Sequence, residues 1–441
     1  KSMLNSSTVR LMEYISTLSK KTVSIDDICV DLKCARRRLY YNIHKLNTIL
    51  KDHGFQTIEL GSGILRVPDG LEAGAGTAIL SSDPEYVFSS EERKLIISVK
   101  VGISSRPVTV ESLMQLLNVS RNTILAEVTE LRGILKQKEV FLKSHSKGGY
   151  DLDGDEIMVR NAVIECLNQP ENLKMQQIME EMITEAVNEK AGRNRERGEL
   201  FGALRGIIQS AENCTSGQFS SNAVTEIAYY LCIVYLRQGK PSAVKTDGEI
   251  SRLPEYRAAE LVTGRMEALG MKIAEAELCY IATVMTGARL QQFNETYGNR
   301  EPILSEFAED LLRTFEQKAL VEFPDKTRLK EQLMVHLRPM YYRLKYSIHV
   351  DHQFSGIIIQ QYRDLYNLTD LAVKTVEDKY GFRVPAEEIA YLAIFFGSFV
   401  KYHGSREKSQ SGTILIVCAA GVSSAMLIRQ QLIFLLGSGY T

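Results

Sequence analysis

The stretch Val108–Leu135, VTVESLMQLLNVSRNTILAEVTELRGIL, sets the fold that we expect for the N-terminal third of this 441-residue chain. Thr109 is placed to cap a first helix, and Ser120 to cap a second one after a turn of a few residues. Apolar residues recur at helical spacing in both segments, so each predicted helix has one face for a core. The stretch therefore predicts two short helices joined by a tight turn.

A related stretch, Val23–Leu50, occurs earlier and reads VSIDDICVDLKCARRRLYYNIHKLNTIL. Each copy is followed by a segment with β signals and turn glycines, near 57–67 after the first copy and over Val140–Leu152 after the second. Two helices and a hairpin in each copy predict two winged helix-turn-helix domains, over 1–67 and 91–165. The intervening segment 68–90 is rich in Gly, Ala, Ser and Pro, which is typical of a linker.

Such a domain reads DNA with the start of its second helix in the major groove, while nearby cations hold phosphates. Residues 1–67 carry eleven Lys/Arg against six Asp/Glu, although the whole chain has a net charge of −1. A single unit could equally be a helical hairpin with solvated charges, but its recurrence favours DNA binding. The expected DNA contacts are Arg36, Arg37, Arg38, Tyr41, Lys45, Ser120, Arg121, Asn122, Thr123, Lys143 and Lys147.

The C-terminal half contains a second internal repeat, with apolar residues at helical spacing throughout. Two spaced motifs occur twice and in the same order: Tyr230-Leu231-x5-Arg237 with His336-Leu337-x5-Arg343, and Gly270-x6-Glu277-x2-Tyr280 with Gly381-x6-Glu388-x2-Tyr391. Two all-helical modules are therefore predicted, over 170–292 and 303–403.

Two side chains in this half are candidate phosphoacceptors. His336 lies beside the apolar stripe of a helix predicted over Leu329–Leu344, and neutral imidazole is nucleophilic near pH 7. Cys418 ends a β-branched run, and the turn after it places Gly421, Ser423 and Ser424 before a predicted helix. Converging N–H groups at such a turn bind anions and lower a thiol pKa. Simple structural roles, a packed histidine and a strand-ending cysteine, remain the alternatives.

The order of these parts resembles that of bacterial regulators carrying phosphotransferase-system regulation domains (PRDs), of the mannitol-operon activator and lichenan-operon regulator type. The pieces that carry the resemblance are KGGYDLDGDE (Lys147–Glu156), HLRPMYYRL (His336–Leu344), EEIAYLAIFFGSF (Glu387–Phe399) and CAAGVSS (Cys418–Ser424). The resemblance implies a mainly α, multidomain chain. Its second winged helix-turn-helix would be Mga-like, the helical modules would be PRDs, and a linker over 404–412 would precede an incomplete α/β enzyme-IIB-like domain at 413–441.

The resemblance also implies a function. The chain would be a homodimer, formed through its PRDs, that binds promoter DNA and activates a carbohydrate operon. The phosphotransferase system (PTS), through HPr and enzymes IIA and IIB, would phosphorylate His336 and Cys418. PRDs usually carry two phosphorylatable histidines each, and the repeat places these positions at Tyr230 and Val284, then at His336 and Phe395. We therefore expect the first PRD to be a structural or dimerisation module.

Three alternatives remain: a phosphotransferase subunit passing phosphate from Cys418 to sugar, an RNA-binding antiterminator, and an Mga-like virulence regulator with degenerate PRDs. The helix-turn-helix units argue against the first two, and the CAAGVSS turn argues against the third. No enzymatic activity or cofactor is expected of a regulator of this kind. No zinc site or disulfide framework is expected either, because the seven cysteines form no CxxC pair. Without an apolar run of membrane-spanning length or an export leader, we expect a cytoplasmic protein.

Overall fold

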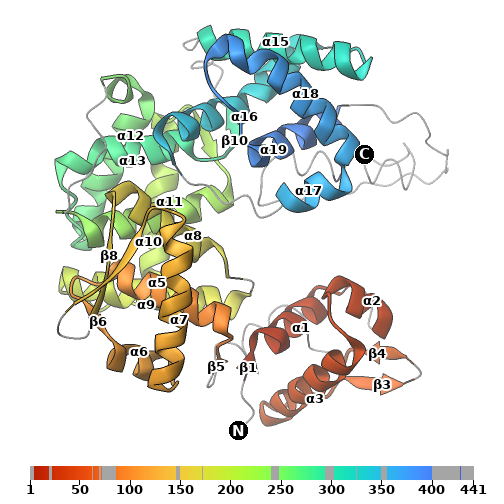
Figure 1. Cartoon of the computed structure of the whole chain (residues 1–441), viewed down its shortest axis with the longest axis vertical. Coiled ribbons are helices and arrows are strands. Elements are labelled where there is room, and N and C mark those ends of the chain that lie inside the picture. Colours follow the sequence, from red (N-terminus) through yellow and green to blue (C-terminus); the bar gives the residue numbers. More distant parts are fainter. Residues whose placement is uncertain are drawn as a thin grey trace. The chain divides into compact units, whose positions relative to one another are not determined.

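The computed structural model describes residues 4–18, 22–61, 63–68, 71, 86–145, 149–170, 172–239, 248–293, 302–323, 325–348, 355–399 and 428. The chain divides into two compact units, residues 1–154 with 166–185, and residues 155–165 with 186–441. Helices dominate both units (Figure 1), which confirms the prediction of a mainly α, multidomain chain. Every helix within the described ranges is too short or too polar to cross a bilayer.

The first group of elements in unit one is three helices with a small antiparallel sheet in the order β2-β4-β3. Its elements are α1 (Ser6–Thr17), β2 (Thr22–Ser24), α2 (Ile25–Asp31), α3 (Arg36–Asp52), β3 (Glu59–Gly61) and β4 (Ile64–Arg66). The Ser24 side chain accepts the N–H of Asp26 and so caps α2. Leu11, Ile28 and Leu39 are fully buried between the helices. The hairpin of β3 and β4 extends away from this core (Figure 1).

The second group repeats this order of elements. It consists of β5 (Tyr86–Val87), α5 (Ser90–Ile103), β6 (Val108–Thr109), α6 (Val110–Leu117), α7 (Arg121–Lys136), β7 (Phe141–Ser144) and β8 (Gly149–Asp153). Its sheet has the order β6-β8-β7. The turns between the paired helices match, since Lys33 and Asn118 both have left-handed φ values, 50° and 51°. The segment 68–90 was expected to be a linker. Within it, Tyr86 and Val87 form the strand β5, which pairs with β1 (Leu4–Asn5).

Two helices connect the units in sequence, α8 (Glu156–Asn168) and α9 (Leu173–Ala191), and each has residues in both. Unit two then continues with α10 (Arg197–Ala211), β9 (Gly217–Phe219), α11 (Ser221–Arg237), α12 (Pro254–Met266), α13 (Leu278–Gly287) and β10 (Leu290–Phe293). It ends with α15 (Pro302–Ala319), α16 (Lys326–Tyr346), α17 (Ser355–Gln361), α18 (Arg363–Tyr380) and α19 (Ala386–Gly397).

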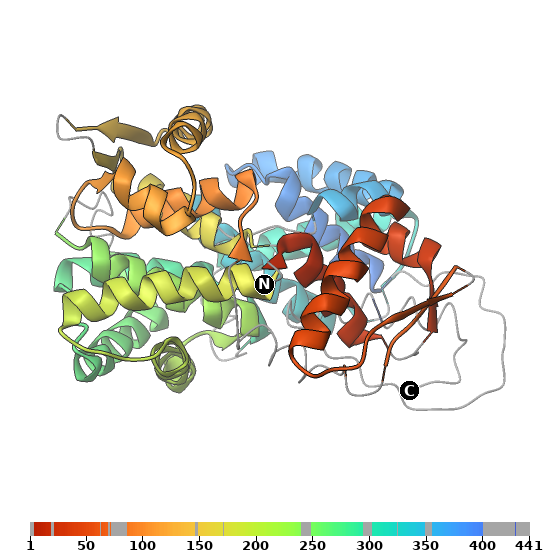
Figure 2. The same ribbon diagram turned by 90° about the horizontal axis from the view of Figure 1, so that it is seen from below.

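The two motif sets of the sequence repeat occupy equivalent helices in unit two. Tyr230 and His336 lie on α11 and α16, while Tyr280 and Tyr391 lie on α13 and α19. Gly270 and Gly381 both end a helical segment with φ near 70° (74° and 72°), a conformation that favours glycine. Figure 2 shows the helices of the first repeat (green) beside those of the second (blue), in agreement with the contact between α13 and α16.

Candidate functional site

The start of α3 carries the most basic of the predicted DNA contacts, Arg36-Arg37-Arg38. Its N-cap is Ala35, which has no side-chain oxygen, and its first turn contains no acidic residue. The first N–H groups of α3 therefore have no capping side chain, and the positive end of the helix dipole is not neutralised locally. Such an end is suited to an incoming phosphate.

Two of the predicted DNA-binding arginines are held by acidic neighbours. Arg36 donates to both carboxylate oxygens of Asp26, and Arg121 donates to Glu111 at 2.8 Å. Arg36 is the first residue of α3 and Arg121 the first residue of α7, and in each pair the acidic partner lies ten residues earlier in the chain. The side chains of both pairs are more than half exposed, so each pair contributes little stability. In each pair the carboxylate occupies a guanidinium that could otherwise contact phosphate.

The remaining described candidates are at the surface or half-buried. Tyr41 is 60% exposed, and the Lys45 ammonium lies 5.5 Å from its ring centroid. The Ser120 hydroxyl accepts the N–H of Thr123 at 3.3 Å, so this side chain caps α7. Asn122 is exposed, and Lys143 pairs with Asp153 at 2.7 Å. Lys147, Cys418, Gly421, Ser423 and Ser424 lie outside the described residues, as does the segment 404–412.

His336, on α16, is half-buried and faces α19. Its ring centroid lies 5.6 Å from that of Phe395. It lines a cavity of about 40 Å³ together with Arg289, Arg343 and Glu388. Burial lowers the pKa of His336 to about 4, and the charges of Arg343 and Arg289 act in the same direction. The imidazole is therefore neutral at pH 7, beside two guanidinium groups.

Arg343 is fixed in this cavity by three hydrogen bonds to two partners. It donates to both oxygens of Glu388 at 2.7 Å, and to the carbonyl of Gly287 at 2.8 Å. A Cβ at Gly287 would lie only 3.0 Å from Cγ of Arg343, so a larger residue there would crowd the arginine. The guanidinium of Arg289 covers the ring of Tyr391 at 4.5 Å.

The corresponding positions of the first repeat carry no imidazole. Tyr230 is buried, its hydroxyl donates to Oδ1 of Asn161 at 3.2 Å, and burial raises its pKa. Val284 is also buried. Neither side chain offers a nitrogen nucleophile, and both pack in the interior of the bundle.

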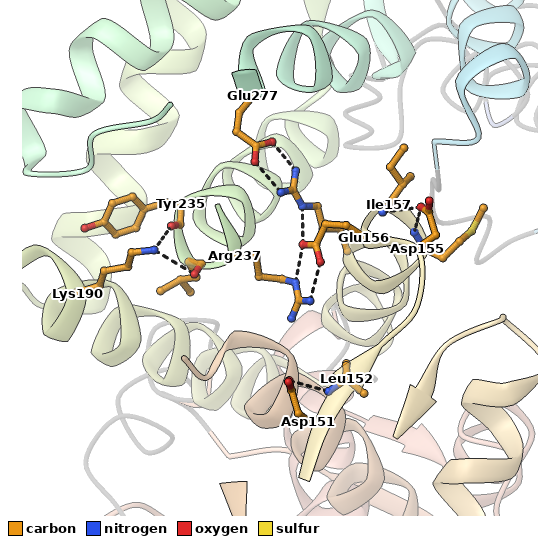
Figure 3. A network of polar contacts seen from close by, with 12 residues as sticks. Asp151, Leu152, Asp155, Glu156, Ile157, Lys190, Tyr235, Arg237 and Glu277 are labelled. Atoms are coloured by element: carbon orange, nitrogen blue, oxygen red, sulfur yellow. Dashed lines mark hydrogen bonds and ion pairs between the residues drawn. The ribbon is translucent and has the colours of Figure 1, made fainter. Parts of the chain in front are cut away.

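In the first repeat, α8 supplies a buried carboxylate, Glu156, and a buried guanidinium, Arg160. Arg237 donates to both oxygens of Glu156 at 2.7 and 2.8 Å, and Arg160 donates to Glu156 at 2.9 Å. Arg160 also donates to both oxygens of Glu277, at 2.7 and 2.8 Å (Figure 3). Arg343 and Glu388, the equivalents of Arg237 and Glu277, are bonded directly. Thus α8 inserts Glu156 and Arg160 between the partners of a repeated pair.

A second buried ion pair joins the two repeats. Arg338 on α16 donates to both oxygens of Glu255 on α12 at 3.1 Å, and to the hydroxyl of Ser216 at 2.6 Å. Burial would raise the pKa of Glu255, but the charge of Arg338 and the hydrogen bonds outweigh it, and the pKa is lowered. Sequence patterns did not identify Glu156, Arg160, Glu255 or Arg338. Two of the four, Glu156 and Arg338, occur in the motifs KGGYDLDGDE and HLRPMYYRL, and this is the one sequence feature that could have drawn attention to them.

Comparison with known proteins identifies a domain within unit two and two relatives. Residues 309–399, which include most of α15 and all of α16, α18 and α19, match the family model of the PRD domain. The chain is 22% identical over 449 residues to a Bacillus subtilis (strain 168) protein named "Probable licABCH operon regulator". It is 20% identical over 446 residues to the transcriptional regulator ManR of the same organism.

Each alignment covers 96% of this chain and 66% of the relative, so the chain spans slightly less than two thirds of the length of either relative. Two findings confirm the resemblance expected from the sequence: the match to the PRD domain and the similarity over 96% of this chain. The chain is a PRD-containing relative of bacterial transcription regulators.

Proposed function

We propose that this chain is a DNA-binding transcription regulator of a carbohydrate-utilisation operon, controlled by PTS phosphorylation. The observation that carries the proposal is the match of residues 309–399 to the PRD domain, in a chain similar to two operon regulators over 96% of its length. As the resemblance implies, the regulator is an activator and a homodimer formed through its PRDs.

The arrangement of α3 and α7 supports DNA binding. Each follows a short helix and a left-handed turn, and precedes an antiparallel hairpin. The uncapped start of α3 and its three arginines give that helix the stronger attraction for phosphate. Because Arg36 is engaged with Asp26, Arg37 is the arginine that we expect to contribute most directly.

The surroundings of His336 support its role as phosphoacceptor. A ring nitrogen of the neutral imidazole attacks the phosphorus of a phosphohistidine donor, the new N–P bond forms, and the N–P bond of the donor breaks. Arg289 and Arg343 line the same cavity and can balance the charge that arrives. Cys418 is proposed as the second phosphoacceptor on the sequence of its turn alone.

DNA binding is tested with promoter fragments from the protein's own locus, measured by fluorescence anisotropy over a series of salt concentrations. Arg37→Ala should weaken binding and reduce the slope of log K against log salt by about 0.9, the value for one phosphate contact. Arg257→Ala, which removes an exposed arginine of α12, is the matched control and should bind like the wild type. Identical binding by all three proteins would refute the role of α3.

The phosphotransferase-subunit alternative makes a different prediction. The purified chain, supplied with a phosphorylated enzyme IIA and candidate sugars, would then release sugar phosphate with turnover. A regulator accepts the phosphoryl group once per site and releases no sugar phosphate.

A further inference from the structure

We propose that Cys29 and Cys34, on either side of the turn between α2 and α3, are a redox-sensitive thiol pair that a hydroperoxide converts to a disulfide. Cys29 lies in the last turn of α2, and Cys34 lies two residues before the start of α3. Both are half-buried thiols that pack against the same core. Disulfides in reducing compartments are usually transient and redox-sensing, and this pair has the features of one.

The backbone of the turn brings the two cysteines together. The N–H of Cys34 donates to the carbonyl of Cys29 at 3.0 Å, and the N–H of Lys33 donates to the carbonyl of Val30 at 3.2 Å. Lys33 is left-handed, with a φ of 50°. Two nested bonds around a left-handed residue form a Schellman motif, in which the side chains of the two outermost residues commonly meet. Here those two residues are the cysteines.

The surroundings of Cys29 agree with this closeness. Burial raises the pKa of its thiol, and the neighbouring Cys34 raises it further. Disulfides span Cα–Cα distances of about 4.4–6.8 Å, a range that two residues joined by a backbone hydrogen bond can meet. A disulfide here therefore requires the two thiols to approach each other, but it does not require α2 or α3 to unfold.

The second helical group shows that such a turn does not need thiols. There the N–H of Val119 donates to the carbonyl of Met114 at 3.3 Å, next to the left-handed Asn118 with a φ of 51°. Met114 and Val119 therefore hold the positions that Cys29 and Cys34 hold in the first group. Since apolar side chains close the same turn, packing does not require cysteine at either position.

Cys34 is the thiol that an oxidant reaches first. It lines a cavity of about 100 Å³, and Cys29 is not part of that lining. A cavity needs about 10–15 Å³ to admit one water molecule, so this one has room for hydrogen peroxide. The raised pKa of Cys29 keeps that thiol protonated at pH 7, and a protonated thiol is a poor nucleophile. Cys34 is therefore the peroxide-reacting thiol, and Cys29 the thiol that completes the disulfide.

The reaction consumes one hydrogen peroxide for each disulfide. The deprotonated sulfur of Cys34 attacks a peroxide oxygen, the S–O bond forms, the O–O bond breaks, and the departing hydroxide takes a proton to become water. The sulfur of Cys29 then attacks the sulfur of Cys34, the S–S bond forms, the S–O bond breaks, and hydroxide leaves as water with the thiol proton of Cys29. The two sulfurs lose two electrons, which reduce the peroxide. A dithiol reverses the oxidation by thiol–disulfide exchange.

The disulfide would act on the start of α3. Ala35, the N-cap of α3, directly follows Cys34, and Arg36 begins the helix with its side chain held by Asp26 of α2. Drawing Cys34 toward Cys29 therefore shifts the end of α3 that carries the basic residues, and we expect weaker DNA binding. The thiol pair itself does not rest on the proposed function, whereas its effect on DNA does.

The disulfide is tested on the full chain. Reduced protein is treated with hydrogen peroxide, its remaining thiols are alkylated, and it is digested with trypsin without reductant. Trypsin cleaves after Lys33, so the disulfide should join the peptides 22–33 and 34–36. Wild type should yield this linked pair, dithiothreitol should abolish it, and Cys29→Ser should not form it. The control Cys214→Ser removes another half-buried thiol and should form the pair like wild type.

The order of the two steps has its own readout. Cys29→Ser should stop at the sulfenic acid of Cys34, which dimedone labels, whereas Cys34→Ser should leave Cys29 unlabelled. Equal labelling of the two variants would overturn the assignment of Cys34 as the first thiol. Wild type in which both cysteines stay fully alkylatable after peroxide, or in which either links instead to another cysteine, would overturn the proposal. This last measurement needs no variant to fold.

Promoter binding by the same samples separates the site from its consequence. Oxidised wild type should bind about tenfold more weakly than reduced wild type, the loss expected for one base contact, and dithiothreitol should restore the affinity. Cys34→Ser should bind equally before and after peroxide. Equal binding by reduced and disulfide-linked wild type would overturn the effect on α3. Wild type that forms the disulfide but binds no DNA in either state would contradict the proposed function and leave the thiol pair supported.

Discussion

The imidazole of His336 on α16 and the ring of Phe395 on α19 lie next to each other, with their centroids 5.6 Å apart and their planes tilted by 56°. These are the two positions at which the resembled regulators usually carry phosphorylatable histidines. The second repeat therefore presents one nucleophile against an aromatic ring, with Arg289 and Arg343 lining the same cavity. A phosphoryl group on His336 would meet those cations rather than a second histidine.

Phosphorylation at His336 is the first prediction. Incubation with labelled phosphoenolpyruvate, enzyme I and HPr should label the chain, because His336 is neutral and lies beside two guanidinium groups. His336→Ala should lose this label. His145→Ala, which removes an exposed histidine, is the control and should keep it. Equal labelling of His336→Ala and wild type would remove His336 from the mechanism.

Acid should destabilise the protein partly through His336. In the unfolded chain the imidazole takes up a proton below about pH 6.5, whereas in the folded chain it does so only near pH 4. Between these values the unfolded state binds more protons, so falling pH favours unfolding. Urea midpoints should therefore fall less between pH 7 and pH 5 in His336→Gln than in wild type or in the control His44→Gln. The same fall in all three proteins would contradict the low pKa.

The buried pair Arg343–Glu388 should contribute strongly to stability. Glu388→Gln leaves the Arg343 guanidinium buried beside a neutral amide, which should cost about 3–5 kcal/mol of unfolding free energy. The control Asp370→Asn breaks the more exposed pair with Lys374 and should cost less than about 1 kcal/mol. Denaturant titration followed by circular dichroism measures both. Comparable losses of unfolding free energy in the two variants would mean that the buried pair stabilises the fold no more than the exposed pair does.

Releasing Arg121 from its acidic neighbour should strengthen DNA binding. Glu111→Gln frees the guanidinium and removes a negative charge near the start of α7, so affinity for the promoter should rise by up to about fivefold. Glu331→Gln, which neutralises an exposed acid of α16, serves as the control and should have no effect. Weaker binding by Glu111→Gln would show that the ion pair positions Arg121 for DNA.

Periodic features of the fold could be predicted from the sequence. Apolar spacing predicted the helical composition, and the repeated motifs placed Gly270 and Gly381 at equivalent positions, where both end a helical segment with a left-handed φ value. The strands β9 and β10 were not expected, since such short strands depend on a distant partner rather than on a local pattern. The cavity residues around His336 come from α16, α19 and the segment before β10, which only the tertiary structure brings together.

The buried charged residues could not be predicted from sequence patterns either. Glu156, Arg237 and Glu277 are far apart in sequence, and charged side chains are ordinarily expected at the surface. Sequence spacing could not show that α8 would bring Glu156 and Arg160 between the other two.

The insertion of α8 into the first repeat also determines how the protein can be divided. The sequence repeat suggests a module that starts at residue 170, yet Glu156 and Arg160 neutralise Arg237 and Glu277 inside it. A recombinant fragment beginning at residue 170 would lack the two α8 side chains that bond Arg237 and Glu277, and it should be less stable than a longer fragment. One beginning at residue 155 retains their counterparts. The piece of the helical half that keeps these buried contacts is therefore longer at its N-terminus than its sequence motifs suggest.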